Sequence, residues 1–289
     1  MSTHPGAALR RLIEARKGTL LPGAANALSA RIIEDLGFEA VYLTGAGVTN
    51  SWLGLPDHGF IGLTDIANHT AAVRDAISLP LVCDVDTGFG NAVNVYHTVR
   101  VMERAGANAI QLEDQVIPKK CGHFAGKVLV DTDEMCGKIK AAVDARQSED
   151  FLIIARTDAR AVEGFDAAVE RCHAFEEAGA DIIFLEAPES VEELRALPQA
   201  IRSPQIVNVV IGGKTPVLSN EEFAEMGFSL VLYANVALQA AIAGMSKALS
   251  ALKAGQDVLE TSGIVAGFDE RQRVVRKPFF DELEKKYAD

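Results

Sequence analysis

The chain has 289 residues, 48% of them hydrophobic and 24% charged, with a formal net charge of −12 at pH 7. This length matches a one-domain α/β barrel, and the apolar fraction is ample for a large core. So acidic a chain is a poor partner for nucleic acid. Its apolar runs are too short to span a membrane, and residues 1–18 lack the apolar core of a signal peptide. We therefore expect a cytoplasmic protein with no membrane partner.

A pattern of helix end, glycine and apolar run occurs four times, at Gly37, Gly106, Gly179 and Gly227. Glycine after an acidic amphipathic stretch is the usual left-handed helix stop. A continuous apolar run after it is typical of a strand buried on both faces of a parallel sheet. Four more runs resemble these strands without the glycine lead-in. In chain order, the eight predicted strands lie at residues 19–24, 38–44, 79–86, 107–113, 151–157, 180–186, 205–210 and 228–234.

Helical patterns lie between these strands. Two stretches have apolar residues at helical spacing, and two S-x-x-E motifs predict capping boxes that open further helices. Strands that alternate with helices predict a closed (β/α)8 TIM-type barrel. A doubly wound open sheet is the alternative, although Gly45-Ala46-Gly47 is only a fragment of the GxGxxG fingerprint. The helical signals are residues 91–105, residues 165–178, Ser190 with Glu193, and Ser219 with Glu222.

The barrel is expected to occupy residues 1–252, followed by a C-terminal helical tail over residues 253–289. Residues 277–289 have the pattern of a short amphipathic helix. Its apolar residues, Phe279, Phe280 and Leu283, need a surface to cover. We expect the tail to pack on its own barrel or to be swapped with a neighbouring subunit.

Polar residues occur at six of the eight predicted strand ends. Such barrels keep their chemistry at the C-terminal ends of the strands. Removing so many polar groups from water at one end of the barrel costs free energy. A shared ligand or metal therefore explains them better than packing does. These residues are Thr44, Asp84 with Asp86, Glu113, Arg156 with Asp158, Glu186 and Asn208.

Asp84 and Asp86 are the strongest sign of a metal among these residues. Residues two apart on a strand point to the same face, so the two carboxylates should stand side by side and repel each other. A divalent cation with a preference for oxygen, Mg²⁺ or Mn²⁺, would resolve that repulsion. Acids that merely cap the next helix are the alternative.

Two loops add candidate residues. Asp57 lies in a turn with glycines nearby, and the turn alone could explain it. The longer loop, residues 114–130, contains Cys121 among Lys119, Lys120 and His123, and Gly122 and Gly126 give it flexible joints, as in a lid. A thiol with a pKa of about 8.5 can donate a proton, and nearby cations stabilise the thiolate that remains. The alternative is a basic loop with an incidental thiol.

The other cysteines, Cys83, Cys136 and Cys172, are expected to be packing residues. The chain has no CxxC pair, which argues against a disulfide framework or structural zinc.

Five motifs resemble the isocitrate lyase / phosphoenolpyruvate mutase superfamily, in the same order from about residue 20 to residue 235. The chain is short, like the 2-methylisocitrate lyases, 2,3-dimethylmalate lyases and oxaloacetate hydrolases of that superfamily. The resemblance implies a (β/α)8 barrel, Mg²⁺ or Mn²⁺, and a homotetramer with a swapped C-terminal helix. The motifs are YLTGAG (42–47), DVDTGFGN (84–91), QLEDQ (111–115), KKCGH (119–123) and ARTDA (155–159).

The resemblance also implies roles for individual residues. Asp84 would bind the metal directly, while Asp86, Glu113 and Asp57 would hold its water ligands. Cys121 would be the general acid, and Arg156, His123 and Glu113 would be the other catalytic residues. The residues that would bind the substrate, a di- or tricarboxylate, are Thr44, Gly45 and Ala46, together with Gly122, His123, Arg156, Glu186 and Asn208.

The implied activity is carbon–carbon bond cleavage in a 2-hydroxy dicarboxylate. Where the 2-methylisocitrate lyases carry Arg after CGH, this chain has Phe124, and residues 208–216 lack the acidic residue expected after the Asn. Both departures weaken the case for a third substrate carboxylate. We therefore expect a substituted malate such as 2,3-dimethylmalate, ahead of oxaloacetate hydrolysis and 2-methylisocitrate cleavage. A phosphonate mutase fits less well, because the mutases lack the cysteine of KKCGH.

Overall fold

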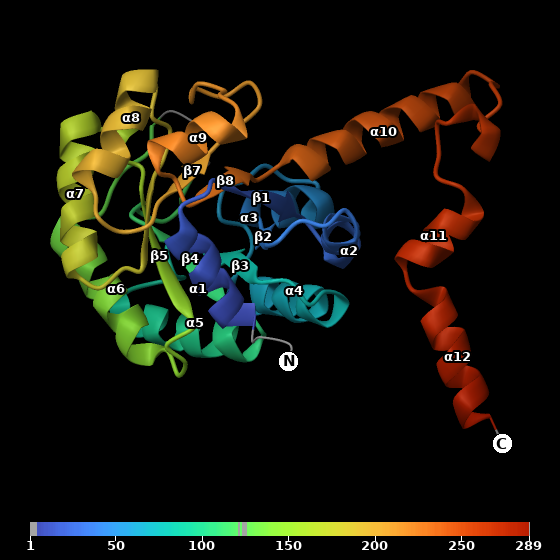
Figure 1. The fold of residues 1–289 in the computed structure, drawn as a ribbon, viewed down its shortest axis with the longest axis horizontal. Helices are drawn as coiled ribbons and strands as arrows, with labels where there is room; N and C mark the ends of the chain where they lie inside the picture. The colour runs from blue at the N-terminus through green and yellow to red at the C-terminus, as the bar shows by residue number, and fades with distance from the viewer. Residues whose placement is uncertain (1–4, 121, 123–125, 289) are drawn as a thin grey trace.

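The computed structural model describes residues 5–120, 122 and 126–288 of the chain, and its centre is a barrel (Figure 1). Eight parallel strands follow the order β6-β5-β4-β3-β2-β1-β8-β7. A parallel bridge between Ile183 and Gln205 joins the two ends of that order, so the sheet closes on itself. The predicted (β/α)8 barrel is confirmed, and the open-sheet alternative is wrong. The strands are β1 (Thr19–Ala24), β2 (Val41–Leu43), β3 (Leu81–Asp84), β4 (Ala109–Glu113), β5 (Leu152–Thr157), β6 (Ile182–Leu185), β7 (Ile206–Asn208) and β8 (Leu230–Tyr233).

Helices surround the barrel, and short helical turns lie in three of the connections. The helix α1 precedes the first strand, and α10 leaves the barrel after the last one (Figure 1). The helices of the barrel are α1 (Pro5–Ala15), α2 (Ala27–Asp35), α3 (Gly45–Val48), α4 (Leu63–Ala76), α5 (Ala92–Arg104), α6 (Thr132–Ala145), α7 (Phe165–Glu177), α8 (Val191–Ala200) and α9 (Asn220–Met226). The tail contains α10 (Val236–Lys253), α11 (Phe268–Val274) and α12 (Lys277–Tyr287), and the turns are η1 (Thr49–Leu53), η2 (Ala159–Ala161) and η3 (Glu260–Ser262).

The local signals for helix ends agree with the structure, with one exception. All four repeat glycines have positive φ, between 81° and 102°, as a left-handed helix stop requires. Ser219 and Glu222 form the predicted capping box at α9. The box predicted at α8 is only half formed: Ser190 accepts a hydrogen bond from the Glu193 N–H, but the Glu193 carboxylate turns away to Arg160 and to the N–H of Glu189. The Glu193 carboxylate thus pairs with Arg160 instead of accepting from the N–H of Ser190.

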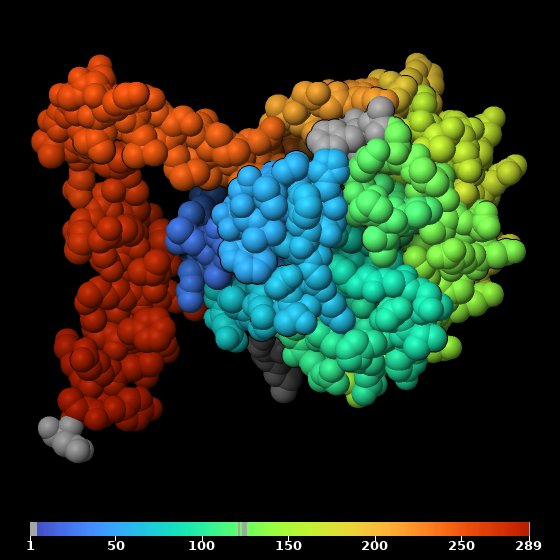
Figure 2. Space-filling model, turned by 180° about the vertical axis from the view of Figure 1, so that it is seen from behind, coloured from blue at the N-terminus to red at the C-terminus, as the bar shows by residue number. Residues whose placement is uncertain are grey.

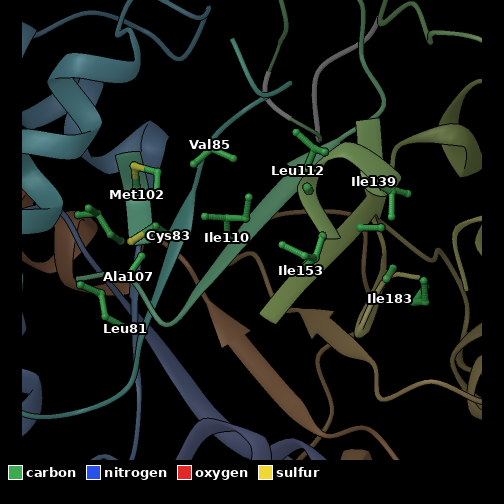
Figure 3. Close-up of a cluster of buried hydrophobic side chains, with 14 of the residues drawn as sticks. Leu81, Cys83, Val85, Met102, Ala107, Ile110, Leu112, Ile139, Ile153 and Ile183 are labelled. Atoms are coloured by element: carbon green, nitrogen blue, oxygen red, sulfur yellow. The ribbon is translucent and has the colours of Figure 1, made fainter. Parts of the chain in front are cut away.

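Alternation along the strands produces two packing layers. One set of side chains fills the barrel interior, where Leu9 and Ile13 of α1 close the N-terminal end. The other set faces the helices and forms the larger core, in which Cys83 and Ile110 pack near Met102 of α5 (Figure 3). Cys83 and Cys172 are buried and Cys136 is half-buried; all three are free thiols, as expected of packing residues.

The tail projects sideways from the barrel (Figures 1 and 2). The helix α10 crosses the expected boundary between residues 252 and 253, and Ala251 is its one buried residue. The tail returns towards its own barrel at α2, where Arg273 pairs with Asp35 at 3.0 Å and Arg276 with Glu34 at 3.3 Å. Within the described part of the chain, no helix combines the length and apolar character needed to cross a membrane.

Candidate active site

A cavity of about 180 Å³ opens at the C-terminal ends of the barrel strands. Strand alternation explains its composition. Phe184 and Ile206 belong to the interior layer. The residue two positions after each also faces the barrel interior, but lies nearer the C-terminal end of the barrel. Those positions carry Glu186 and Asn208, and the same relation holds for Thr44, Asp84 and Arg156. Glu113 lies four residues after Ala109 of the same layer, with the buried Gln111 between them. Nine of the expected site residues line this cavity: Thr44, Ala46, Asp57, Asp84, Glu113, Gly122, Arg156, Glu186 and Asn208.

Asp84 and Asp86 lie side by side, but for a different reason from the one expected. The strand β3 ends at Asp84, and Asp86 has a left-handed φ of 49°, so a tight turn rather than strand alternation brings them together. The Asp86 N–H donates to Asp84 Oδ1 at 3.1 Å, and the Gly45 N–H donates to Asp84 Oδ2 at 3.3 Å. A β-carbon on Gly45 would lie 3.1 Å from Asp84 Oδ2 and 3.3 Å from Asp86 Oδ1, so glycine leaves room beside both carboxylates.

Lys119 is the cation closest to these acids. Its Nζ lies 2.6 Å from Asp57 Oδ1 and 2.8 Å from Asp86 Oδ1, and its side chain is buried. Burial raises the pKa of Asp86 to about 7, even though Lys119 lowers it. Burial also raises the pKa of Glu113 well above its usual value, against the attraction of Arg156 and Lys119. One ammonium group therefore does not compensate the charge that this side of the cavity would carry with all its acids ionised.

The donor set fits a divalent cation held partly through water. Glu113 Oε1 is buried and accepts no hydrogen bond from any described residue, while the buried Asp86 Oδ1 has the Lys119 ammonium group as its partner. Among the residues that the structure describes, no three acidic, histidine or cysteine side chains converge tightly enough to chelate an ion alone. Mg²⁺ usually binds one or two carboxylates and keeps several waters, so it needs no such cluster. A cation there would favour the ionised form of each acid.

Arg156 lies across the cavity, inside a group of carboxylates. Its Nε and Nη2 each donate to Asp158 at 3.1 Å, and Glu113 and Glu186 approach within 3.5 and 3.6 Å. Burial alone would raise the pKa of Asp158, but Arg156 and Lys127 hold it below its usual value. Arg156 is thus fixed as a planar cation that can bind a ligand carboxylate through its remaining N–H groups.

Apolar residues also line the cavity. Phe184, Val210, Leu232 and Ala234 line it, and the Arg156 guanidinium lies 5.3 Å from the centre of the Phe184 ring. The cavity therefore pairs charged groups with space for small alkyl groups.

Several lining residues were not expected from the sequence. Tyr42, Phe184 and Leu232 belong to the interior layer directly below the predicted residues, so the period of two could have found them. Tyr42 donates to Gln111, which in turn donates to Asp84 Oδ1 at 3.3 Å. Lys119 belongs to a motif that was noted for its thiol, and only the fold shows its ammonium group between two acids.

Two expected residues, Cys121 and His123, lie outside the described part of the chain. Gly122 is described, and its backbone lies against the cavity: a β-carbon there would be 2.3 Å from Arg156 Nη2 and 2.7 Å from Glu186 Cγ. Only glycine allows the chain to approach Arg156 and Glu186 so closely.

Comparisons with known proteins agree with this architecture. Residues 9–253 match the family described as phosphoenolpyruvate phosphomutase. The chain is 44% identical to 2,3-dimethylmalate lyase of Eubacterium barkeri over 99% of both chains, and 50% identical to 2-methylisocitrate lyase of Aeropyrum pernix over 80% of this chain and 74% of that enzyme. A crystal structure of 2,3-dimethylmalate lyase superposes with a TM-score of 0.92 at 36% identity, covering 99% of this chain and 96% of that one.

The chain belongs to the phosphoenolpyruvate mutase / isocitrate lyase superfamily. The expected resemblance is confirmed, and so is the expectation of a carbon–carbon lyase, since both of these relatives are named lyases. Another similar structure, phosphonopyruvate hydrolase, was solved with oxalate and Mg²⁺; its TM-score is 0.88 at 30% identity, over 99% of both chains.

Proposed function

We propose that the chain cleaves a carbon–carbon bond in a substituted malate, with 2,3-dimethylmalate as the first candidate, to give pyruvate and a carboxylic acid. The observation that carries this proposal is the mixed lining of the cavity, in which acids and Arg156 occur together with four apolar residues, Phe184, Val210, Leu232 and Ala234. The full-length similarity to 2,3-dimethylmalate lyase of Eubacterium barkeri supports it.

The superfamily is metal-dependent, and Mg²⁺ or Mn²⁺ is the proposed cofactor. Asp84 would bind it directly, and Asp86, Glu113 and Asp57 would hold its waters. The ion would supply positive charge that favours the alkoxide form of the substrate hydroxyl. Three of these acids, Asp57, Asp84 and Asp86, are already held close together by the turn after β3 and by Lys119.

The chain's own residues would bind the two halves of the substrate and move a proton. Arg156 would bind the carboxylate of the pyruvate half, next to the backbone of Gly45 and Ala46 and the hydroxyl of Thr44. As the bond breaks, its electron pair passes to the departing carbon, where the neighbouring carboxylate delocalises the charge. Cys121 would then protonate that carbon. The proton of the substrate hydroxyl would go to an ionised carboxylate of the cavity, that of Asp57, Glu113 or Glu186, or to a bound water.

The apolar lining residues favour methyl-bearing dicarboxylates over tricarboxylates. A third carboxylate would need its own cationic partner. Three cations line the described cavity. Lys119 already pairs with Asp57 and Asp86, and Arg156 is surrounded by three carboxylates. The ammonium group of the third, Lys120, donates to the Gly126 carbonyl at 3.0 Å. The volume, about 180 Å³, also suits a small acid.

A panel of acids tests the substrate. The purified protein is incubated with Mg²⁺ and 2,3-dimethylmalate, malate, 2-methylisocitrate, isocitrate or oxaloacetate, and pyruvate, glyoxylate and oxalate are measured. We expect pyruvate from 2,3-dimethylmalate with kcat/KM at least about tenfold above any other acid, since each buried methyl group is worth about 1 kcal/mol or more. Oxalate from oxaloacetate as the main product would replace this assignment with a hydrolase.

The tail is proposed to pack on a neighbouring subunit in a homotetramer. Ile242, Met245 and Leu249 of α10 are each more than half exposed, as are Phe279 and Phe280 of α12. Burying a large apolar side chain is worth about 1.5–3 kcal/mol, so these exposed residues favour association.

Removing α11 and α12 should therefore weaken the assembly. A chain that ends at Lys253 is expected to have a lower mass in solution by light scattering and a lower thermal midpoint than the full chain. The double substitution Phe279→Ser and Phe280→Ser should act in the same direction. A truncated chain with the full-length mass and midpoint would contradict the proposed packing.

A further inference from the structure

A buried lysine beside the cavity has no part in the chemistry proposed above. The side chain of Lys127 is 2% exposed, and its Nζ lies 2.7 Å from Asp158 Oδ1. The same ammonium group donates a hydrogen bond to the backbone carbonyl of Gly122. A buried ammonium group is costly unless it is paired and hydrogen-bonded, so these two acceptors fix its position. Lys127 therefore ties the backbone at Gly122 to the end of β5.

Gln115 makes the matching connection from the other end of the same loop. Its side-chain amide holds both backbone groups of Lys120: Oε1 accepts from the N–H at 2.9 Å, and Nε2 donates to the carbonyl at 2.8 Å. The Nε2 group also donates to Asp158 Oδ2 at 3.2 Å. Gln115 is 1% exposed, so water does not compete for these bonds.

The base of the loop is held by backbone pairing. The Val116 N–H donates to the Val128 carbonyl at 2.8 Å, and the Val130 N–H donates to the Asp114 carbonyl at 2.9 Å. Gln115 and Lys127 thus extend from this paired base and donate hydrogen bonds to the carbonyls of residues 120 and 122. The residue between those carbonyls is Cys121.

Asp158 is the shared anchor of both side chains. The same carboxylate accepts two hydrogen bonds from Arg156, each 3.1 Å long. Its position therefore governs both the proposed carboxylate-binding cation and the backbone that flanks Cys121. A shift of this one group would move the two together.

We propose that Gln115, Lys127 and Asp158 form a clamp that sets the position of the backbone at Lys120 and Gly122, the two sequence neighbours of Cys121, relative to Arg156. This inference rests on the proposed function, in which Cys121 protonates the departing carbon. The three are positioning residues, because they act through the backbone and through Arg156. An error of about 1 Å in the placement of a reacting group can cost about 10²-fold in rate.

The substitution Lys127→Met tests the clamp, because methionine fills similar space without an N–H group. We expect kcat to fall about 10²-fold while KM changes less than about threefold, since substrate binding keeps Arg156 and the metal acids. Backbone hydrogen exchange of the peptide covering residues 115–130 should become faster. Lys127→Arg, which restores donors, should recover part of kcat, and Gln115→Leu should repeat both effects.

Lys140→Met is the matched control, since Lys140 is exposed on α6; we expect its kcat and exchange to equal those of the wild type. Thermal unfolding and Mg²⁺ titration exclude a general loss of structure. Unchanged exchange over residues 115–130, or faster exchange with kcat unaffected, would overturn the clamp. If the wild type cleaves no acid of the panel, the proposed function fails, and hydrogen exchange still tests whether the clamp exists.

Discussion

Replacing Cys121 by serine should reduce turnover by about 10³-fold, because a general acid typically contributes 10²–10⁴-fold. Serine keeps the size and polarity of the side chain, but its hydroxyl is a far weaker acid than a thiol. The carbanion left by bond cleavage would then have no efficient proton donor. The measurement is kcat for pyruvate release, together with Mg²⁺ affinity by calorimetry, which should not change.

Cys136→Ser is the control for this substitution. Cys136 is half-buried on α6, where its thiol donates to the Ala174 carbonyl at 3.5 Å. It does not line the cavity. We expect its turnover to stay within about twofold of the wild type, as for most substitutions away from the chemistry. A Cys121→Ser enzyme that retained more than about a tenth of wild-type kcat would remove the lyase mechanism. It would favour the mutase alternative, which does not use this thiol.

Replacing Asp84 by asparagine should abolish metal binding and activity together. Asp84 holds three N–H donors, from Asp86, Gly45 and Gln111, and asparagine would lose the negative charge and turn a donor towards some of them. Because the metal is worth several kcal/mol in transition-state stabilisation, we expect kcat/KM to fall by at least about 10³-fold. The heat of Mg²⁺ or Mn²⁺ binding should vanish in the same titration range.

Stability separates this loss from unfolding. Asp84 shares a buried site with Asp86, so removing one charge relieves repulsion. Loss of hydrogen bonds to Asp84 opposes this gain, so the metal-free Asp84→Asn protein should unfold cooperatively within a few degrees of the metal-free wild type. Asp75→Asn, on the exposed face of α4, is the control and should bind metal normally. Retained Mn²⁺ affinity in Asp84→Asn would show that another residue is the direct ligand.

The barrel could be predicted from local patterns, because each of its units carries its own signal. Gly37, Gly106, Gly179 and Gly227 mark helix ends that only a left-handed residue satisfies, and buried apolar runs follow them. Since the C-terminal ends of parallel strands meet at one rim, the residues that should share a cavity follow from the strands alone. That argument placed Thr44, Asp84, Glu113, Arg156, Glu186 and Asn208 around a single opening.

Contacts between distant segments could not be predicted in this way, because no local pattern encodes them. The left-handed turn at Asp86 and the position of the Lys119 ammonium group between Asp57 and Asp86 depend on the folded loops. The same is true of Asp158, which joins Arg156 to Lys127 and Gln115. The sequence by itself determined the barrel and the residues at its rim, since helix stops and strand periods are local. Only the tertiary structure decided which cation faces which carboxylate, because such pairs join loops that are far apart in the sequence.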